Sequence, residues 1–295
     1  MQVKVEKQPK SSVKLTVTVP NDRVKDTYEH ILDEVVKSAE LPGFRKGTAP
    51  KDMVKEKTNV SKLYGEVINS LLQTYYTQAV KENHITAISN PKVEIKEFDL
   101  EKDFEFTAVV ATRPDVKVGD YKKKLQEIQK AREKAITEEN AKKLAAGEKL
   151  EEAHVHLHPN DVIDALVKVT EVDVADVLIE EETERMMSRL VDQAQSIGLS
   201  LDQYLKAQNK TVEQLRKDYE TISERNLKAE FVMAHLVKEH KIEVDDKEIE
   251  DVVRASGVTN VEEQLNDPVQ KWYVKSILEK NKLITQLTEE VAHHE

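Results

Sequence analysis

The residues best suited to contact a partner lie in one short stretch, from Leu41 to Pro50 (LPGFRKGTAP). It holds two of the seven glycines and two of the eight prolines of the chain. Glycine permits positive φ angles and proline fixes φ, so this density of both predicts a loop. Within the loop, Phe44, Arg45 and Lys46 place an aromatic ring beside two cations, a combination suited to binding anions. The simpler alternative is an ordinary helix–helix loop with solvated charges.

A second candidate is the run of alternating histidines His154, His156 and His158, directly before Pro159. On a strand, the three imidazoles would share one face and could bind zinc or nickel. No carboxylates or histidines with matching spacing surround them, and the proline indicates a joint between helices. We therefore predict no metal site.

No motif of a known catalytic site occurs in the sequence. A phosphate-binding loop, GxSxG, HExxH and a dinucleotide fingerprint are all missing, so we expect neither enzyme activity nor a cofactor. The sequence has no cysteine, which excludes disulfides and thiolate metal sites and fits a reducing compartment. No apolar run is long enough to span a bilayer, so we expect a soluble, cytoplasmic protein without membrane contact.

Composition indicates long helices with polar faces and modest cores. The 295 residues allow two or three domains, 34% of them are charged and only 5% are aromatic. Charge is unevenly distributed, because the first 60 residues carry a small excess of bases, whereas residues 150–295 carry nearly twice as many acids as bases. The acidic half is therefore not expected to bind nucleic acid, while the N-terminal part remains a candidate.

Residues 1–115 show two regions of strand-like alternation with helical periodicity between them. The alternating apolar residues are Val3, Val5, Val13, Leu15, Val17 and Val19 in the first region, and Val93, Ile95, Phe104, Phe106, Ala108 and Val110 in the second. Asn21 or Asp22 is the expected N-cap of the first helix, and the second helix is expected to break near Thr58 and Asn59. The pattern predicts a ββααββ domain, in which two helices cover one face of a four-stranded antiparallel sheet.

Residues 116–160 differ from this domain, since they are rich in Lys, Glu, Ala and Gln and carry only a thin apolar stripe. They predict an exposed helical linker, or two helices broken near Gly147. The lysine run 122–124 is either a solvated helix face or a contact for an acidic partner.

Residues 161–295 show only helical periodicity, which predicts an elongated all-α domain with helices that extend as arms. The expected helices lie at about 176–197, 201–208, 211–240, 245–255, 260–266 and 268–291. Asp161, Thr211 and Asp245 are the expected N-caps. The whole chain is therefore predicted to be an α+β protein.

The loop sequence Gly43-Phe44-Arg45-Lys46-Gly47-Thr48-Ala49-Pro50 resembles the ribosome-docking signature Gly-Phe-Arg-x-Gly-x-x-Pro of the trigger factor family, the bacterial ribosome-associated chaperones. Every fixed position matches, and the surrounding ββααββ pattern is also similar. Segments 113–116 and 165–179 resemble the family's exit from this domain and the start of its helical domain. The resemblance covers residues 1–118 and 162–292.

The resemblance implies that the loop contacts ribosomal RNA and a ribosomal protein at the polypeptide exit tunnel. The implied docking residues are Gly43, Phe44, Arg45, Lys46, Gly47 and Pro50. The two cations would neutralise phosphate or carboxylate groups, and the aromatic ring would stack or fill a groove.

One departure from the family concerns its peptidyl-prolyl isomerase domain. Such a domain needs about 100 residues, whereas about 45 residues separate the two matched parts here, with Tyr121 as their only aromatic residue. They are too few to form the apolar, aromatic prolyl pocket, so isomerase activity is predicted to be absent.

The resulting hypothesis is an ATP-independent chaperone that holds nascent and unfolded polypeptides on an apolar surface. The candidate client-binding residues are Met186, Met187, Leu190, Phe231, Met233, Trp272, Tyr273 and Ile277. Alternatively, most of them are ordinary helix core. Because self-association has a precedent in the family, a homodimer is a further possibility for the protein when it is not bound to a ribosome. The rival functions are a non-ribosomal assembly scaffold or holdase for folded partners, and a residual prolyl isomerase.

Overall fold

The structure, a computed structural model, describes residues 1–145, 157–258 and 260–292. The chain divides into two compact units, which are residues 1–114 with 175–185 (unit 1) and residues 115–174 with 186–295 (unit 2). Among the described helices, none combines the length and the apolar composition that crossing a lipid bilayer requires.

Unit 1 contains an antiparallel sheet in the order β1-β2-β4-β3. Its strands are β1 (Gln2–Gln8), β2 (Ser12–Val19), β3 (Lys92–Ile95) and β4 (Phe104–Ala111). Val17 lies opposite Val3 on one side and Phe106 on the other, and Ile95 is also opposite Phe106. Since directly opposed residues point to the same face, these four apolar side chains share one face of the sheet.

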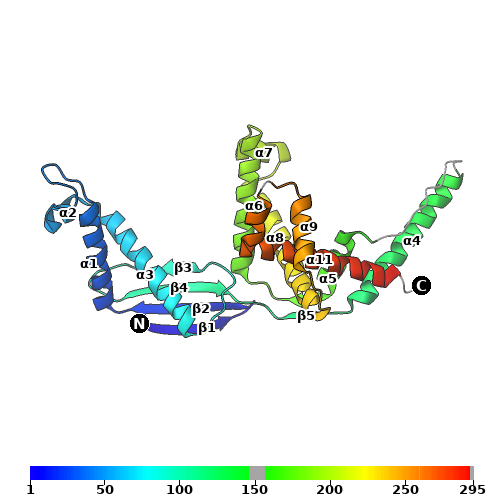
Figure 1. The fold of residues 1–295 in the computed structure, drawn as a ribbon, viewed down its shortest axis with the longest axis horizontal. Coiled ribbons are helices and arrows are strands. Elements are labelled where there is room, and N and C mark those ends of the chain that lie inside the picture. Colours follow the sequence, from blue (N-terminus) through cyan, green and yellow to red (C-terminus); the bar gives the residue numbers. More distant parts are fainter. Residues whose placement is uncertain (146–156, 259, 293–295) are drawn as a thin grey trace. The chain divides into compact units, whose positions relative to one another are not determined.

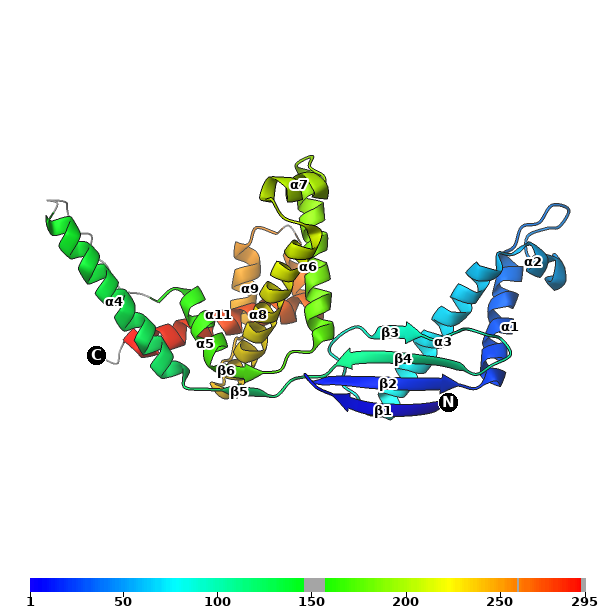
Figure 2. The ribbon, with the colours of Figure 1, turned by 180° about the vertical axis from the view of Figure 1, so that it is seen from behind.

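Two helices cover this apolar face, as the alternation predicts. They are α1 (Asn21–Ser38) and α3 (Val60–Glu82), and both views show them on the same side of the sheet (Figure 1, Figure 2). The buried residues of this core are Leu15, Val17, Val19, Val24, Tyr28, Leu32, Leu63, Val67, Leu71, Ala79, Phe104, Phe106 and Ala108. Each large side chain among them contributes about 1.5–3 kcal/mol by leaving water.

The expected break in the second helix is confirmed. The short helix α2 (Lys51–Lys57) ends before Thr58, and α3 begins at Val60. The side chain of Asn59 accepts a hydrogen bond from the N–H of Lys62, so it caps the new helix.

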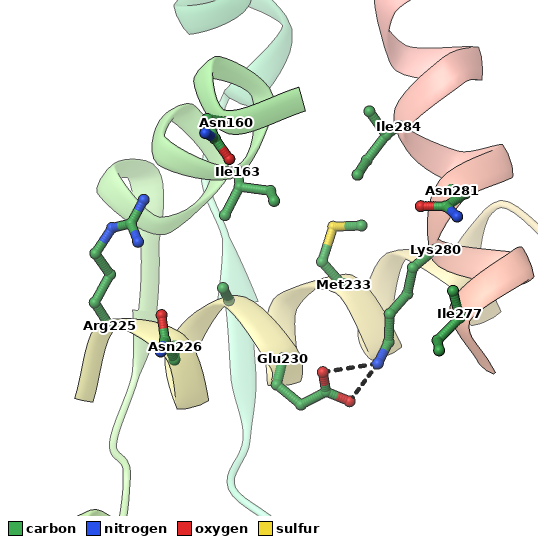
Figure 3. Close-up of a pocket in the computed structure, with 11 residues that line it drawn as sticks. Asn160, Ile163, Arg225, Asn226, Glu230, Met233, Ile277, Lys280, Asn281 and Ile284 are labelled. Atoms are coloured by element: carbon green, nitrogen blue, oxygen red, sulfur yellow. Dashed lines mark hydrogen bonds and ion pairs between the residues drawn. The ribbon is translucent and has the colours of Figure 1, made fainter. Parts of the chain in front are cut away.

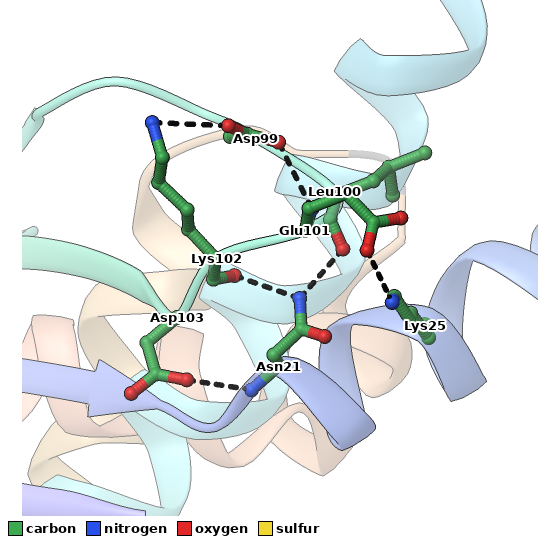
Figure 4. Close-up of polar contacts among 7 residues, drawn as sticks. All are labelled: Asn21, Lys25, Asp99, Leu100, Glu101, Lys102 and Asp103. Atoms are coloured by element: carbon green, nitrogen blue, oxygen red, sulfur yellow. Dashed lines mark hydrogen bonds and ion pairs between the residues drawn. The ribbon is translucent and has the colours of Figure 1, made fainter.

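The expected N-cap of α1 is wrong, because the cap position is taken by Pro20 and Asn21 is the first helical residue. The main-chain N–H of Asn21 donates instead to Oδ1 of Asp103, at 2.9 Å. The side-chain amide of Asn21 donates to the carbonyl oxygens of Leu100 and Lys102 (Figure 4). The loop between β3 and β4 thus accepts the hydrogen bonds that the first residue of α1 donates, although it lies about 80 residues further along the sequence.

Residues 175–185 complete unit 1 through polar contacts. Lys10 donates to Asp176 at 2.6 Å, and Lys92 donates to Glu180 at the same distance. Asn90 donates to Glu181 at 2.5 Å. These residues form the first half of the helix α6 (Asp176–Ser196).

Unit 2 begins with a short strand pair that the helical periodicity did not predict. Strand β5 (Val116–Val118) pairs antiparallel with β6 (Thr170–Val172), with Val116 opposite Val172. Three residues are too few to show a period of two, and the partner strand lies far along the chain. The pair adds a small sheet to a region that is otherwise helical, as predicted.

The helix α4 (Tyr121–Ala145) packs into unit 2 by its first turns. Leu125 is buried in the main apolar cluster, and Ile128 packs against it. Within the lysine run, Lys122 pairs with Glu290 at 3.0 Å, and Lys124 pairs with Glu127 at 2.9 Å. Lys122 and Lys124 of this run therefore form ion pairs within the chain.

The other helices of unit 2 end close to their predicted limits. They are α5 (Pro159–Val169), α7 (Leu201–Gln208), α8 (Val212–Glu239), α9 (Asp246–Ala255), α10 (Val261–Asn266) and α11 (Pro268–Ala292). Thr211 and Asp245 are confirmed as N-caps, each in a capping box. Asp161 is not the N-cap of α5, because that position belongs to His158, whose N–H donates to the Asp161 carboxylate at 2.9 Å.

The described part of unit 2 buries its apolar side chains in separate clusters. The main cluster joins α4, α5, α8 and α11 through Leu125, Leu157, Val162, Ala165, Leu166, Val232, Met233, Leu236, Val237, Leu283, Leu287 and Val291. A second cluster contains Leu190, Leu205 and Leu215. A third contains Val244, Ile249 and Val253, with Val274 and Leu278 of α11 packed against it.

Candidate partner-binding sites

The loop between α1 and α2, residues 39–50, is held in a closed shape by hydrogen bonds within it. The N–H of Gly47 donates to the carbonyl of Ala39, and the N–H of Phe44 donates to that of Leu41, both at 3.0 Å. The main-chain N–H and the hydroxyl of Thr48 both donate to the carbonyl of Arg45. The loop is therefore a hydrogen-bonded turn at the end of α1 (Figure 1).

Two glycines are required by this turn, as the composition of the loop predicts. Gly43 has a φ of +90° and Gly47 a φ of +74°, in a region that other residues rarely adopt. A Cβ on Gly47 would lie 2.7 Å from the carbonyl oxygen of Lys37, whereas a Cβ on Gly43 would have no neighbour within 4 Å. Gly47 is thus constrained by both conformation and contact, and Gly43 by conformation alone.

The turn presents an aromatic ring and two cations to solvent. Phe44 is 38% exposed, which is unusual for a phenylalanine, and Arg45 and Lys46 are exposed beside it. Nζ of Lys46 lies 3.6 Å from a carboxylate oxygen of Glu40, and this solvent-exposed ion pair contributes little to stability. The three side chains that the sequence singles out are therefore brought together at one accessible tip.

Lys51, the first residue of α2 after the loop, forms ion pairs with two carboxylates of α1. Its Nζ lies 2.5 Å from a carboxylate oxygen of Glu29 and 2.7 Å from one of Asp33. Hydrogen bonds to Asp33 and Glu29 raise the pKa of Lys51 to about 12. The same hydrogen bond from Lys51 lowers the pKa of the Asp33 carboxyl below its ordinary value.

Two of the candidate client-binding residues lie in the core. Leu190 is 8% exposed in the cluster with Leu205 and Leu215, and Met233 is 5% exposed in the main cluster. Met186, Met187 and Phe231 are partly buried. For Leu190 this placement favours the core alternative, whereas Met233 also lines a pocket.

The remaining candidates lie on α11 and face solvent. Trp272 is 67% exposed and Tyr273 57% exposed, and Ile277 is exposed one turn further along. Val269, which the sequence reasoning missed, is exposed one turn before Tyr273. Residues 269, 272, 273 and 277 follow helical spacing and form one apolar surface, here called the α11 stripe.

The α11 stripe leads into a pocket between α5, α8 and α11 with a volume of about 420 Å³ (Figure 3). The pocket brings together Met233 and Ile277, which lie far apart in the sequence. Its other lining residues are Asn160, Ile163, Arg225, Asn226, Ala229, Glu230, Lys280, Asn281 and Ile284. None of these was singled out from the sequence, because surface asparagines and single isoleucines on separate helices give no local signal.

A metal site finds no support in the described part of the chain, where no group of three or more His, Cys, Asp or Glu side chains could hold an ion. His158 is the N-cap of α5, a structural role. His154 and His156 lie outside the described residues.

Family models cover nearly the whole sequence. Residues 1–147 match the model described as bacterial trigger factor protein, and residues 134–289 match the model of the bacterial trigger factor C-terminus. The two matches overlap, so no segment of the length of an isomerase domain separates them in this sequence.

Curated relatives match the N-terminal part. The trigger factor of Streptococcus mutans is 36% identical over 119 residues, which are 40% of this chain and 28% of the relative. A trigger factor of Streptococcus suis is 33% identical over 153 residues, which are 52% of this chain and 36% of the relative. The chain thus aligns with only about a third of the length of these relatives.

A solved structure shares the fold over the full length of the chain. It comes from work on promiscuous substrate recognition in the folding and assembly activities of the trigger factor chaperone. It has a TM-score of 0.63 and covers 99% of this chain and 100% of the solved chain. The sequence identity is 14%, so this likeness concerns the fold alone.

Proposed function

Since the chain belongs to the bacterial trigger factor family, we propose that it is a cytoplasmic chaperone that docks on the ribosome and holds nascent or unfolded polypeptides without ATP. The observation that carries this proposal is the shape of the loop between α1 and α2. It is a hydrogen-bonded turn whose exposed tip consists of Phe44, Arg45 and Lys46.

We propose that these three side chains contact RNA and protein at the exit of the ribosomal tunnel. The guanidinium of Arg45 suits bidentate contact with phosphate, and the ammonium of Lys46 adds a second cation. The Phe44 ring supplies a face for stacking or a wedge for an apolar groove. Gly43, Gly47 and Pro50 would set the shape of the turn rather than touch the partner.

The α11 stripe and the pocket beside it are proposed to hold the polypeptide. Exposed aromatic and aliphatic side chains on a polar background favour contact with many unfolded segments, each bound weakly. Weak contacts release without a nucleotide, and the sequence contains no phosphate-binding loop that would bind one. The continuity of the two family matches supports a chaperone that holds chains without isomerising proline.

Ribosome co-sedimentation tests the docking proposal. With Phe44, Arg45 and Lys46 all changed to Ala, binding at moderate salt should fall by at least about ten-fold, because two charge-assisted contacts and one apolar contact are lost. A matched control changes Val252, Lys238 and Lys247 to Ala, which removes an exposed apolar side chain and two exposed cations from α8 and α9. The control should bind as the unchanged chain does.

The same preparations should also be assayed for suppression of aggregation of an unfolded client. The loop variant should suppress aggregation normally, since the α11 stripe is intact. Undiminished ribosome binding by the loop variant would remove the docking assignment. A chain that binds ribosomes but suppresses no aggregation would instead favour an assembly scaffold.

A further inference from the structure

The pocket between α5, α8 and α11 has an unusual set of polar groups around an apolar floor. Ile163, Met233 and Ile284 form the floor, with Ile277 at its side (Figure 3). Three asparagines line the same pocket, and each comes from a different helix: Asn160 from α5, Asn226 from α8 and Asn281 from α11. All three are exposed. A side-chain amide both donates and accepts hydrogen bonds, which is also the pattern of a peptide group.

The charged groups of the pocket are compensated within the protein. Nζ of Lys280 lies 2.6 and 2.7 Å from the two carboxylate oxygens of Glu230, which joins α11 to α8 across the pocket wall (Figure 3). Arg225 is hydrogen-bonded to the carboxylate of Asp164. Because no net charge remains from these pairs, charge complementarity favours an uncharged ligand over a carboxylate, a phosphate or an amine.

The apolar surface is elongated rather than compact. It extends along α11 from Val269 to Ile284, a rise of roughly 22 Å at 1.5 Å per residue. An extended polypeptide of about seven residues covers such a length at about 3.3 Å per residue. A compact small molecule would occupy the pocket and leave the stripe at Trp272 and Tyr273 uncovered.

We propose that this pocket binds an uncharged, extended segment of polypeptide by its backbone as well as by its side chains. One aliphatic side chain of the segment enters between Ile163, Met233 and Ile284. The amides of Asn226 and Asn281 hydrogen-bond to the main chain on either side of it. The segment then continues along the α11 stripe. The proposal rests on the proposed polypeptide-holding function and assigns it a site and a ligand chemistry.

Backbone recognition has a consequence for selectivity. Main-chain N–H and C=O groups are the same in every polypeptide, so hydrogen bonds to them add affinity without selecting a sequence. In an unfolded segment these groups are bonded only to water and are accessible to a partner, whereas in a folded segment they are paired with one another. The asparagines would thus distinguish unfolded from folded chains by the state of the backbone.

The test compares two peptides on the full chain. One is a short fluorescein-labelled peptide of uncharged aliphatic residues, and the other is the same peptide with two central N–H groups replaced by ester oxygens. Each ester removes one donor while nearly keeping the shape. By fluorescence anisotropy, the unchanged protein should bind the ester peptide about five- to twenty-fold more weakly, as expected for one or two lost hydrogen bonds.

The double variant Asn226→Ala with Asn281→Ala should bind the two peptides with affinities within about two-fold of each other, because the acceptors are gone. Asn266→Ala, which removes an exposed asparagine on α10, is the matched control and should discriminate as the unchanged protein does. Circular dichroism of each variant establishes that it is folded.

The outcomes separate this inference from the function on which it rests. Equal binding of both peptides by the unchanged protein, or full discrimination by the double variant, overturns backbone recognition and leaves polypeptide holding intact. No binding of either peptide overturns both.

Discussion

The main-chain N–H of Gly47 donates a hydrogen bond to the carbonyl oxygen of Ala39, with 3.0 Å between the two heavy atoms. Ala39 is the residue that follows α1, so this bond returns the loop to the helix that it has just left. The tip residues between these two points are presented by a closed turn and not by a free segment. Presentation of Phe44, Arg45 and Lys46 therefore depends on a residue that is not expected to touch the ribosome.

Replacement of Gly47 by Ala should weaken ribosome binding without unfolding unit 1. The new Cβ would meet the Lys37 carbonyl at 2.7 Å and would hold an L-residue at a φ of +74°. The conformation alone costs about 1–2 kcal/mol, so binding should fall roughly five- to thirty-fold in co-sedimentation. Gly43→Ala carries the same conformational cost at a φ of +90° but meets no neighbouring atom, so its loss should be smaller than that of Gly47→Ala by the cost of the contact with Lys37. Equal losses in the two variants would show that contact with Lys37 is unimportant.

The bond between Lys51 and Asp33 should weaken in acid. Because hydrogen bonding to Lys51 lowers the folded-state pKa of Asp33, its stabilisation is fully present above the ordinary carboxyl pKa and is lost as pH falls through the lowered value. For Lys51, whose pKa is raised to about 12, stabilisation is present below its ordinary value of 10.5 and is lost as pH rises through 12. The contact thus has a broad plateau around neutral pH.

Carboxyl NMR titration of Asp33 can measure this coupling. In Lys51→Met the midpoint should move upward toward the ordinary aspartate value, because the principal hydrogen-bond donor is lost. Lys57→Met, at the other end of α2, is the control and should leave the midpoint in place. An unchanged midpoint in Lys51→Met would contradict the role given to this pair.

Trp272 is the only tryptophan of the sequence and is 67% exposed, so its fluorescence reports on the α11 stripe. Addition of an unfolded client should shift the emission to shorter wavelength as water leaves the indole, and the folded form of the same client should not. Tyr273→Ala should weaken client binding about five-fold, in the range of an aromatic side chain at an interface. Val252→Ala, an exposed apolar residue of α9, should have no effect. Client binding without any spectral shift would place the client elsewhere.

Local patterns were sufficient to predict most of the elements. Leu15, Val17 and Val19 alternate over a strand whose other face is polar, so period and burial agree. Thr211 and Asp245 were recognisable as caps because their partners lie three residues away. The two glycines of the loop are likewise explained by their own φ angles.

Non-local relationships were not predictable in the same way. The carboxylate of Asp103 accepts the N–H of Asn21 at the start of α1 from a distant loop, and the local sequence around Asn21 and Asp22 does not show this partner. Met233 and Trp272 both lie at apolar positions of helical periodicity. Met233 is nevertheless buried in the cluster with residues of α5 and α11, whereas Trp272 is exposed. Burial depends on which helix packs where, and that information is not present in any single helix.

Unit 1 is assembled from two stretches of chain, residues 1–114 and 175–185, and this has a consequence for synthesis. A ribosome makes the chain from its N-terminus, so the sheet and the loop between α1 and α2 are synthesised before the bonds of Lys10, Asn90 and Lys92 to α6 can form. Those bonds must wait for the 60 residues 115–174, which form the beginning of unit 2. The polar contacts of unit 1 with α6 are therefore completed only after the first part of unit 2 has been synthesised.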